Sequence, residues 1–253
     1  MRFRRFVLPI VILLPAIPLR AQVVPQRDPQ AISLLAQSLA VNAGAAGRVQ
    51  DSVAEGTVAW LDGTTSPIIL KTKGQDGLRY EFSSGGVQTV SVFSGGRGHT
   101  SRNGDRRNLP PWATAYLRSM HIPAFSRLGD FARGGMNVIY VGLEDVNGQP
   151  AHHIRLFASP ADQTPPEIEE IISDFHLFLD ARSLLIVKTL SYDYSPDVIE
   201  NRTLVETYLE DYRAVGGLAV PHRITRFIYG QEQMRIILTS VRLNVGLPDS
   251  EFQ

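Results

Sequence analysis

The chain has 253 residues, no cysteine, and 25 basic and 25 acidic side chains. The absence of cysteine excludes disulfides, a thiol nucleophile, cysteine-ligated zinc or iron–sulfur centres and a lipidated cysteine. The length is ample for one large domain that is held together by its core alone.

Residues 1–21 have the pattern of an export signal. Three arginines among the first five residues precede an apolar stretch over residues 7–19, and Ala21 offers a small residue for cleavage before Gln22. The apolar stretch contains three prolines and is shorter than the roughly 20 residues that a membrane-spanning helix needs. We therefore expect a signal peptide cleaved after Ala21, with an uncleaved anchor as the alternative.

The remaining residues, 22–253, are expected to form a single soluble domain in the periplasm. Removal of the signal takes away four arginines and no acid, so the net charge changes from 0 to −4. A mildly acidic exported protein is a poor partner for nucleic acid, and we expect no nucleic-acid binding.

The first predicted element is a helix that begins at Pro29. Asp28 can cap it, apolar residues recur at helical spacing as far as Leu39, and residues 42–47 end it. A β-rich block follows, because Asp-Gly and Gly-Gly pairs separate short apolar runs. The clearest of these runs cover residues 53–61, 68–73 and 87–93.

Further helices are predicted after two proline pairs. Pro110-Pro111 opens a helix over residues 112–120, with a short helical turn around residues 125–131, and Pro165-Pro166 opens another helix. Between them, Asn147-Gly148 joins two strand-like runs and favours a type I′ hairpin turn.

The last part of the chain reads as an antiparallel meander of three strands. Glycine-containing turns separate runs over residues 204–215, 218–229 and 233–243. In the third run, side-chain alternation directs one apolar set to one face and a second set to the other, so we expect both faces to need an apolar cover. The first set is Met234, Ile236 and Leu238, and the second is Ile237, Val241 and Leu243.

These elements predict an α+β fold. We expect one domain with about ten antiparallel strands and two or three helices against one face of the sheet. That sheet can be filled by helices, by a second sheet or by a ligand, and the choice decides the function.

No catalytic or metal-binding pattern is found, and no cofactor is predicted. The sequence lacks zinc-protease, nucleophile-elbow and phosphate-loop motifs. His152 and His153 are adjacent in a strand, so they point to opposite faces and cannot share one metal. Glu206 and Glu210 lie about 13 Å apart along a strand, too far for paired carboxylate chemistry. We interpret the histidines as hydrogen-bonded surface or edge residues, with a hydrolase of unrecognised site as an alternative.

Residues 94–108 combine several glycines with four arginines. We interpret this segment as a mobile, cationic rim that contacts anionic lipid head groups or an acidic partner, with a solvated hairpin as the alternative. The arginines are Arg97, Arg102, Arg106 and Arg107.

Nearby aromatic residues, together with apolar residues of the meander, are expected to line an apolar ligand pocket. Ordinary core packing is the alternative for all of them. These residues are Phe93, Trp112, Tyr116, Phe125, Ile224 and Ile236.

Two segments carry a resemblance to a known family. Residues 208–221 read Tyr-Leu-Glu-Asp-Tyr-Arg-Ala-Val-Gly-Gly-Leu-Ala-Val-Pro, and residues 243–252 read Leu-Asn-Val-Gly-Leu-Pro-Asp-Ser-Glu-Phe. With the order of elements around them, these runs resemble the lipoprotein localisation (LolA/LolB-like) superfamily of periplasmic lipoprotein-sorting carriers.

The resemblance implies an open, strongly curved antiparallel half-barrel with helices on its concave face and an apolar cavity for acyl chains. It also implies a non-enzymatic carrier or sensor of a lipid or lipoprotein acyl chain, with transient contacts to a membrane or an envelope protein. The lack of a lipidated cysteine excludes the membrane-anchored receptor type. A protein-interaction module that regulates an envelope partner is the alternative function.

Overall fold

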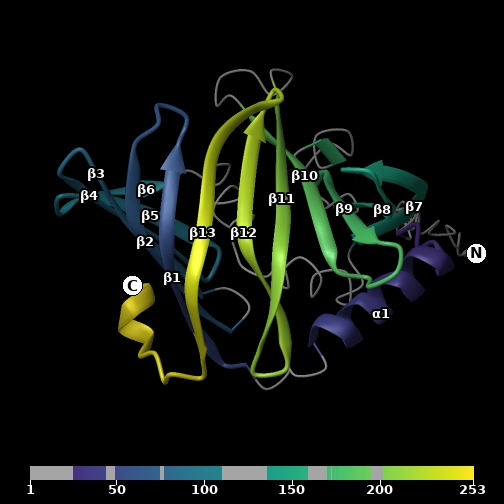
Figure 1. Cartoon of the computed structure of the whole chain (residues 1–253), viewed down its shortest axis with the longest axis horizontal. Coiled ribbons are helices and arrows are strands. Elements are labelled where there is room, and N and C mark those ends of the chain that lie inside the picture. The colour runs from purple at the N-terminus through teal and green to yellow at the C-terminus, as the bar shows by residue number, and fades with distance from the viewer. Residues whose placement is uncertain are drawn as a thin grey trace, which may run out of the picture.

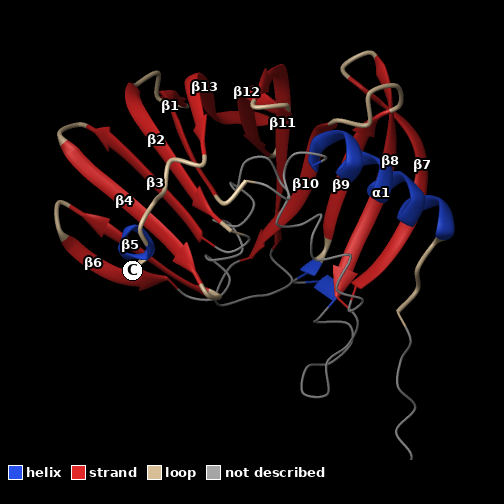
Figure 2. Ribbon diagram, turned by 90° about the horizontal axis from the view of Figure 1, so that it is seen from below, coloured by secondary structure: helices blue, strands red, loops and turns tan. Residues whose placement is uncertain are grey.

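The computed structural model describes residues 25–43, 49–74, 77–109, 136–158, 170–171, 173–194 and 202–253. Within these residues one antiparallel sheet of thirteen strands has the order β6-β5-β4-β3-β2-β1-β13-β12-β11-β10-β9-β8-β7. Figures 1 and 2 show that this open sheet is bent into an arc. The open, curved sheet that the family resemblance implied is therefore confirmed.

The strands are joined mostly by tight turns. The first six are β1 (Asp51–Trp60), β2 (Thr65–Lys73), β3 (Gly77–Ser84), β4 (Val87–Ser94), β5 (Arg97–Arg102) and β6 (Asp105–Leu109). The others are β7 (Met136–Val146), β8 (Gln149–Ala158), β9 (Phe175–Asp180), β10 (Ile186–Tyr194), β11 (Arg202–Val215), β12 (Leu218–Ile228) and β13 (Gln231–Leu243).

The predicted first helix is confirmed as α1 (Pro29–Ala43). The Asp28 carboxylate accepts hydrogen bonds from the backbone N–H groups of Gln30 and Ala31, at 2.8 and 3.2 Å, and so caps the first turn. Ala31 and Leu35 are fully buried, and the helix lies against β7 and β12. We call the sheet face that meets α1 the inner face and the opposite one the outer face.

The predicted meander and the central hairpin are also confirmed. Gly216 and Gly217 both have positive φ, as do Asn147 and Gly148, which is the backbone that a type I′ turn requires. Consecutive strands pair through these turns, so most of the sheet is built from local hairpins.

One pairing joins strands that are far apart in the chain. β1 pairs with β13, and a bulge at Thr239 interrupts the register, because Glu55 pairs with Ser240 while Gly56 pairs with Leu238. A side chain at position 56 would overlap the Ile237 carbonyl oxygen and lie 2.8 Å from the Leu238 Cα atom. Glycine is therefore required where the two strands approach most closely.

The inner face of the sheet carries the main apolar cluster. Its buried members come from α1 and from every strand except β5 and β6. Met234, Ile236 and Leu238 of β13 all belong to it, as the alternation predicted.

The prediction for the second face of β13 is wrong in two respects. The Thr239 bulge reverses the alternation, so Val241 packs against the inner cluster with Ala54. Ile237, on the outer face, is 36% exposed, so that face has no continuous apolar cover at this point.

The structure has thirteen strands where about ten were expected, and two of the additional strands form the regular hairpin of residues 97–109, in line with the hairpin alternative for this segment. Among the described residues, α1 is the one α-helix whose bounds are defined. The helices expected over residues 112–120 and 125–131 and the signal peptide lie outside them, and of the helix after Pro165-Pro166 only residues 170–171 and 173 are described, all helical. No helix in the described part is long and apolar enough to cross a membrane.

The closing segment folds back over the outer face near β2, β3 and β4. The buried Asp51 carboxylate accepts hydrogen bonds from the backbone N–H groups of Val245, Gly246 and Leu247, at 2.6 to 3.3 Å. This turn leads into a 3-10 helix, η2 (Asp249–Phe252), which contacts β3 and β4.

Basic side chains of β2 and β3 fix η2 on the outer face. The Lys71 ammonium group lies 2.9 Å from the Glu251 carboxylate, and Lys73 lies 2.5 Å from Asp249. The Arg79 guanidinium donates a hydrogen bond to the Glu251 carbonyl oxygen at 3.2 Å. These contacts bury the Phe252 side chain against the sheet.

The close approach at Gly56 gives a first prediction. Replacing Gly56 by Ala should lower the free energy of unfolding by about 1–3 kcal/mol or more, because β1 and β13 must separate to admit the methyl group. Urea denaturation measures the change. Thr57→Ala, at the next and exposed position, is the control and should stay within about 0.5 kcal/mol of the wild type. Equal stability of Gly56→Ala and the wild type would contradict the close approach.

Candidate functional site

The inner face contains the part of the expected ligand site that the structure describes. Ile224 of β12 and Ile236 of β13 are direct cross-strand partners, 3% and 0% exposed. Phe93 of β4 is 3% exposed and belongs to the same inner cluster. The structure thus places these three predicted residues on one apolar face. Trp112, Tyr116 and Phe125 lie outside the described residues.

The inner face also holds a charge pair with a buried arginine, which the sequence reasoning missed. Arg226 of β12 pairs with Thr207 and Met234 in the sheet and is only 2% exposed. Its guanidinium lies 3.1 Å from the carboxylate of Asp193 on β10. Burial raises the pKa of Asp193 above its ordinary value, against the opposing effect of Arg226. The period-two alternation after Ile224 could have identified Arg226 as an inner-face residue.

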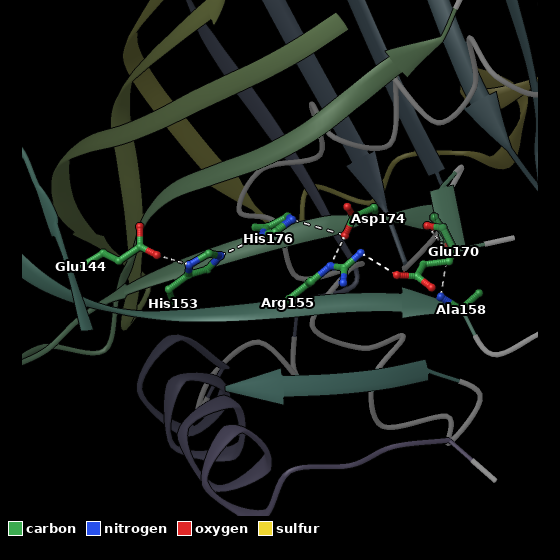
Figure 3. A network of polar contacts seen from close by, with 8 residues as sticks. Glu144, His153, Arg155, Ala158, Glu170, Asp174 and His176 are labelled. Carbon is green, nitrogen blue, oxygen red and sulfur yellow. Dashed lines mark hydrogen bonds and ion pairs between the residues drawn. The ribbon is translucent and has the colours of Figure 1, made fainter. Parts of the chain in front are cut away.

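A network of titratable side chains lies on the outer face across β7, β8 and β9 (Figure 3). The Glu144 carboxylate lies 2.5 Å from His153 Nδ1, and His153 Nε2 lies 2.6 Å from His176 Nδ1. His176 Nε2 lies 3.3 Å from Asp174 Oδ1, without the alignment of a hydrogen bond. The three strands thus bring together four acid–base groups from separate parts of the sequence.

The outer-face network continues from Asp174 through an arginine side chain. Arg155 Nε donates to Asp174 Oδ1 at 2.7 Å, and the other side of its guanidinium donates to Glu170 Oε1 at 2.9 Å. Burial raises the pKa of Asp174, but the contacts with His176 and Arg155 outweigh it and hold that pKa below its ordinary value. The Asp174 carboxylate is therefore a stable anion that fixes Arg155 and His176.

His153 is buried, at 7% exposure, so the expectation of a surface or edge histidine is wrong for this residue. Its ring stacks on Phe178, with the ring centroids 4.3 Å apart. Burial lowers the pKa of His153 below its ordinary value, and the hydrogen bond to Glu144 only partly opposes this. His152, on the neighbouring position, instead contacts the Tyr140 hydroxyl, in line with the predicted opposite orientation.

The outer-face network can hold and pass protons, and the nearby Ser173 hydroxyl makes hydrogen bonds with backbone groups of Ala158 and Glu170. The described residues contain no group of three side chains arranged to hold a metal ion. The thickness of the sheet separates this network from the apolar inner face.

The four predicted arginines do not form one cluster. In the β4–β5–β6 register, Arg97 and Arg106 lie on the outer face, whereas Arg102 and Arg107 lie on the inner face. All four side chains are exposed. The expected single cationic rim is therefore divided between the two faces of an edge hairpin.

The pKa of His153 predicts a pH dependence. The pKa of His153 is lower in the folded than in the unfolded protein. When the pH falls below about 6.5, the unfolded protein therefore binds more protons than the folded one. The free energy of unfolding decreases with falling pH until the pH has passed below the folded-state pKa. His153→Gln should make unfolding stability between pH 8 and pH 5 depend less on pH. His99, whose pKa is also lowered, should retain part of the slope. An unchanged slope in thermal unfolding of His153→Gln would contradict this.

Comparison with known proteins shows a shared fold at low sequence identity. No family model and no curated protein matches the sequence. A putative outer membrane lipoprotein-sorting protein domain from Vibrio parahaemolyticus has 11% identity and a TM-score of 0.57, over 88% of this chain and 96% of that one.

Two other solved structures are similar at 14% identity. A DUF1329 family protein from Desulfovibrio piger has a TM-score of 0.59, over 88% of this chain and 96% of that one. A LolA superfamily protein from Nitrosomonas europaea has a TM-score of 0.52, over 88% and 97%. The structural resemblance to LolA-like proteins, expected from residues 208–221 and 243–252, is therefore confirmed at the level of the fold.

Proposed function

We propose that the protein is a non-enzymatic carrier or sensor of a hydrophobic ligand, such as a lipid or the acyl chain of a lipoprotein, exported to the periplasm. The observation that carries the proposal is the inner face, whose buried apolar side chains run across eleven of the thirteen strands of a curved sheet. A lipoprotein-sorting domain is among the proteins that share this fold, which supports the same class of ligand.

The apolar face is wide, and a ligand is proposed as part of its cover. Among the described residues, α1 alone supplies buried side chains from outside the sheet to the inner cluster. A helix of 15 residues is about 22 Å long, shorter than the span of eleven strands spaced about 4.8 Å apart. Each methylene group of an acyl chain that moves from water into an apolar site contributes about 0.8 kcal/mol.

We propose a non-enzymatic role because the acid–base groups of the outer-face network and the apolar surface are on opposite faces of the sheet. A ligand on Ile224 and Ile236 would be separated by the sheet from His153 and His176. Two ion pairs lie on the inner face among the described residues, Arg226 with Asp193 and Arg107 with Asp105, and each joins a guanidinium to a carboxylate without a nucleophile.

The third prediction tests the inner face with N-phenyl-1-naphthylamine, an uncharged fluorescent probe of apolar sites. The wild type should bind the probe. Ile224→Ala and Ile236→Ala should change the affinity for the probe. Each variant should lose less free energy of unfolding than the 2–5 kcal/mol that is typical of a close-packed core position, because a side chain in the wall of a ligand cavity packs partly against the ligand and not only against other side chains. Fluorescence titration and urea denaturation measure the two effects.

Ile237→Ala is the matched control, because Ile237 follows Ile236 on the same strand but is partly exposed on the outer face. It should leave probe binding unchanged. A loss of 2–5 kcal/mol at both inner positions with unaltered probe binding would reject a ligand site there. No probe uptake by the wild type would favour an interaction module over a carrier.

A further inference from the structure

A hollow lies on the outer face, at the end of the described sheet that β4, β5 and β6 form. It has a volume of about 510 Å³, within the range of small-molecule sites. Arg97, His99, Arg106 and Asn108 line it from the β5–β6 hairpin, Val92 and Phe252 contribute apolar surface, and Gln253 also lines it.

We propose that this hollow binds a phosphate ester that carries an apolar substituent. The site is independent of the inner-face ligand, because it uses the other side of the sheet. The argument rests on three features of the hollow: two arginines without carboxylate partners, a local excess of positive charge, and an adjoining apolar surface.

The arginines differ in their pairing. Arg107, on the inner face of the same hairpin, lies 3.1 Å from the Asp105 carboxylate. Among the described residues, no carboxylate lies within ion-pair distance of Arg97 or Arg106, and no aspartate or glutamate side chain lines the hollow. Two guanidinium groups over one concavity suit a tetrahedral anion, because each can donate two parallel hydrogen bonds to phosphate oxygens.

The positive charge is concentrated at this place. Burial lowers the pKa of His99, and the charges of Arg106 and Arg79 lower it further. The nearest acids of the neighbouring strands are already engaged, since Glu81 and Glu251 contact Lys71 and Arg79. An anion that enters the hollow would therefore meet two guanidinium groups, and no Asp or Glu side chain lines the hollow beside them.

The closing segment supplies the apolar part of the site. Phe252 is 6% exposed and lies in η2, which the contacts of Glu251 with Lys71 and Arg79 hold on the outer face. The side chains of Phe252 and Val92 thus place an apolar surface beside the two arginines. A ligand with an anionic end and a short apolar substituent satisfies both surfaces, whereas free phosphate satisfies only one.

Isothermal titration at low salt tests the proposal with hexyl phosphate, inorganic phosphate and hexanol. Hexyl phosphate should bind about tenfold or more tightly than either of the others, because only it fills both parts of the hollow. Its affinity should fall as salt is raised. The double variant Arg97→Gln with Arg106→Gln should lose about tenfold or more in affinity.

The matched control is Arg102→Gln with Arg107→Gln, which removes two arginines from the same strands on the other face. It should bind hexyl phosphate as the wild type does. Circular dichroism of both double variants checks that the fold is retained. Ile236→Ala should also leave hexyl phosphate binding unchanged, so failure of the inner-face proposal and failure of this one are distinguishable.

Vesicles of phosphatidylcholine and phosphatidylglycerol at a ratio of 7:3 distinguish two sources of the phosphate ester. Vesicle binding that hexyl phosphate competes away would identify a lipid head group, and hexyl phosphate binding without vesicle binding would identify a soluble ester; either result supports the site. The proposal is overturned if the wild type does not bind hexyl phosphate, if inorganic phosphate binds equally well, or if the two double variants behave alike.

Discussion

The pairing of β1 with β13 is the constraint on which the rest of the structure depends. All other neighbouring strands in the described sheet are consecutive in the chain, so they form by local hairpins. Without the β1–β13 pairing, strands β1 to β6 and β7 to β13 would be two separate sheets, each with only part of the apolar face. The contact depends on Gly56, because any side chain there would collide with the backbone of β13. It also closes a long loop of chain, which makes it an entropically costly step of folding.

The alternation of side chains then separates two kinds of chemistry. The inner face gathers apolar residues such as Ile224 and Ile236 around the buried Arg226, and the outer face gathers the titratable network from Glu144 to Glu170 and the Arg97–Arg106 hollow. Because successive residues of a strand face opposite ways, one sequence can build both surfaces without mixing them. A hydrophobic ligand and an anionic ligand could therefore bind independently, and the sheet itself insulates the apolar face from the charged one.

Local signals in the sequence predicted much of this fold, and long-range geometry accounts for the rest. Asp28 before Pro29 predicted α1, and Asn147-Gly148 predicted the β7–β8 hairpin, because caps and turns depend on a few adjacent residues. For the β5–β6 hairpin the sequence left a mobile rim and a solvated hairpin both open, since its glycines and arginines carry little apolar periodicity. The prediction for the face of Val241 was wrong, because the Thr239 bulge arises only from the pairing with β1. The contact of His153 with His176 depends on the β8–β9 register, which no local pattern specifies.

The central claim is that the inner face holds a hydrophobic ligand. The most direct measurement is organic-solvent extraction of the protein purified from its own cells, followed by mass spectrometry of the extract. The account predicts a lipid or acylated molecule present in an amount comparable to the protein, and depleted when Ile236 is replaced by a bulkier Phe that fills part of the ligand space. A purified, folded protein whose extract contains no hydrophobic molecule above that of an unrelated control protein would contradict it.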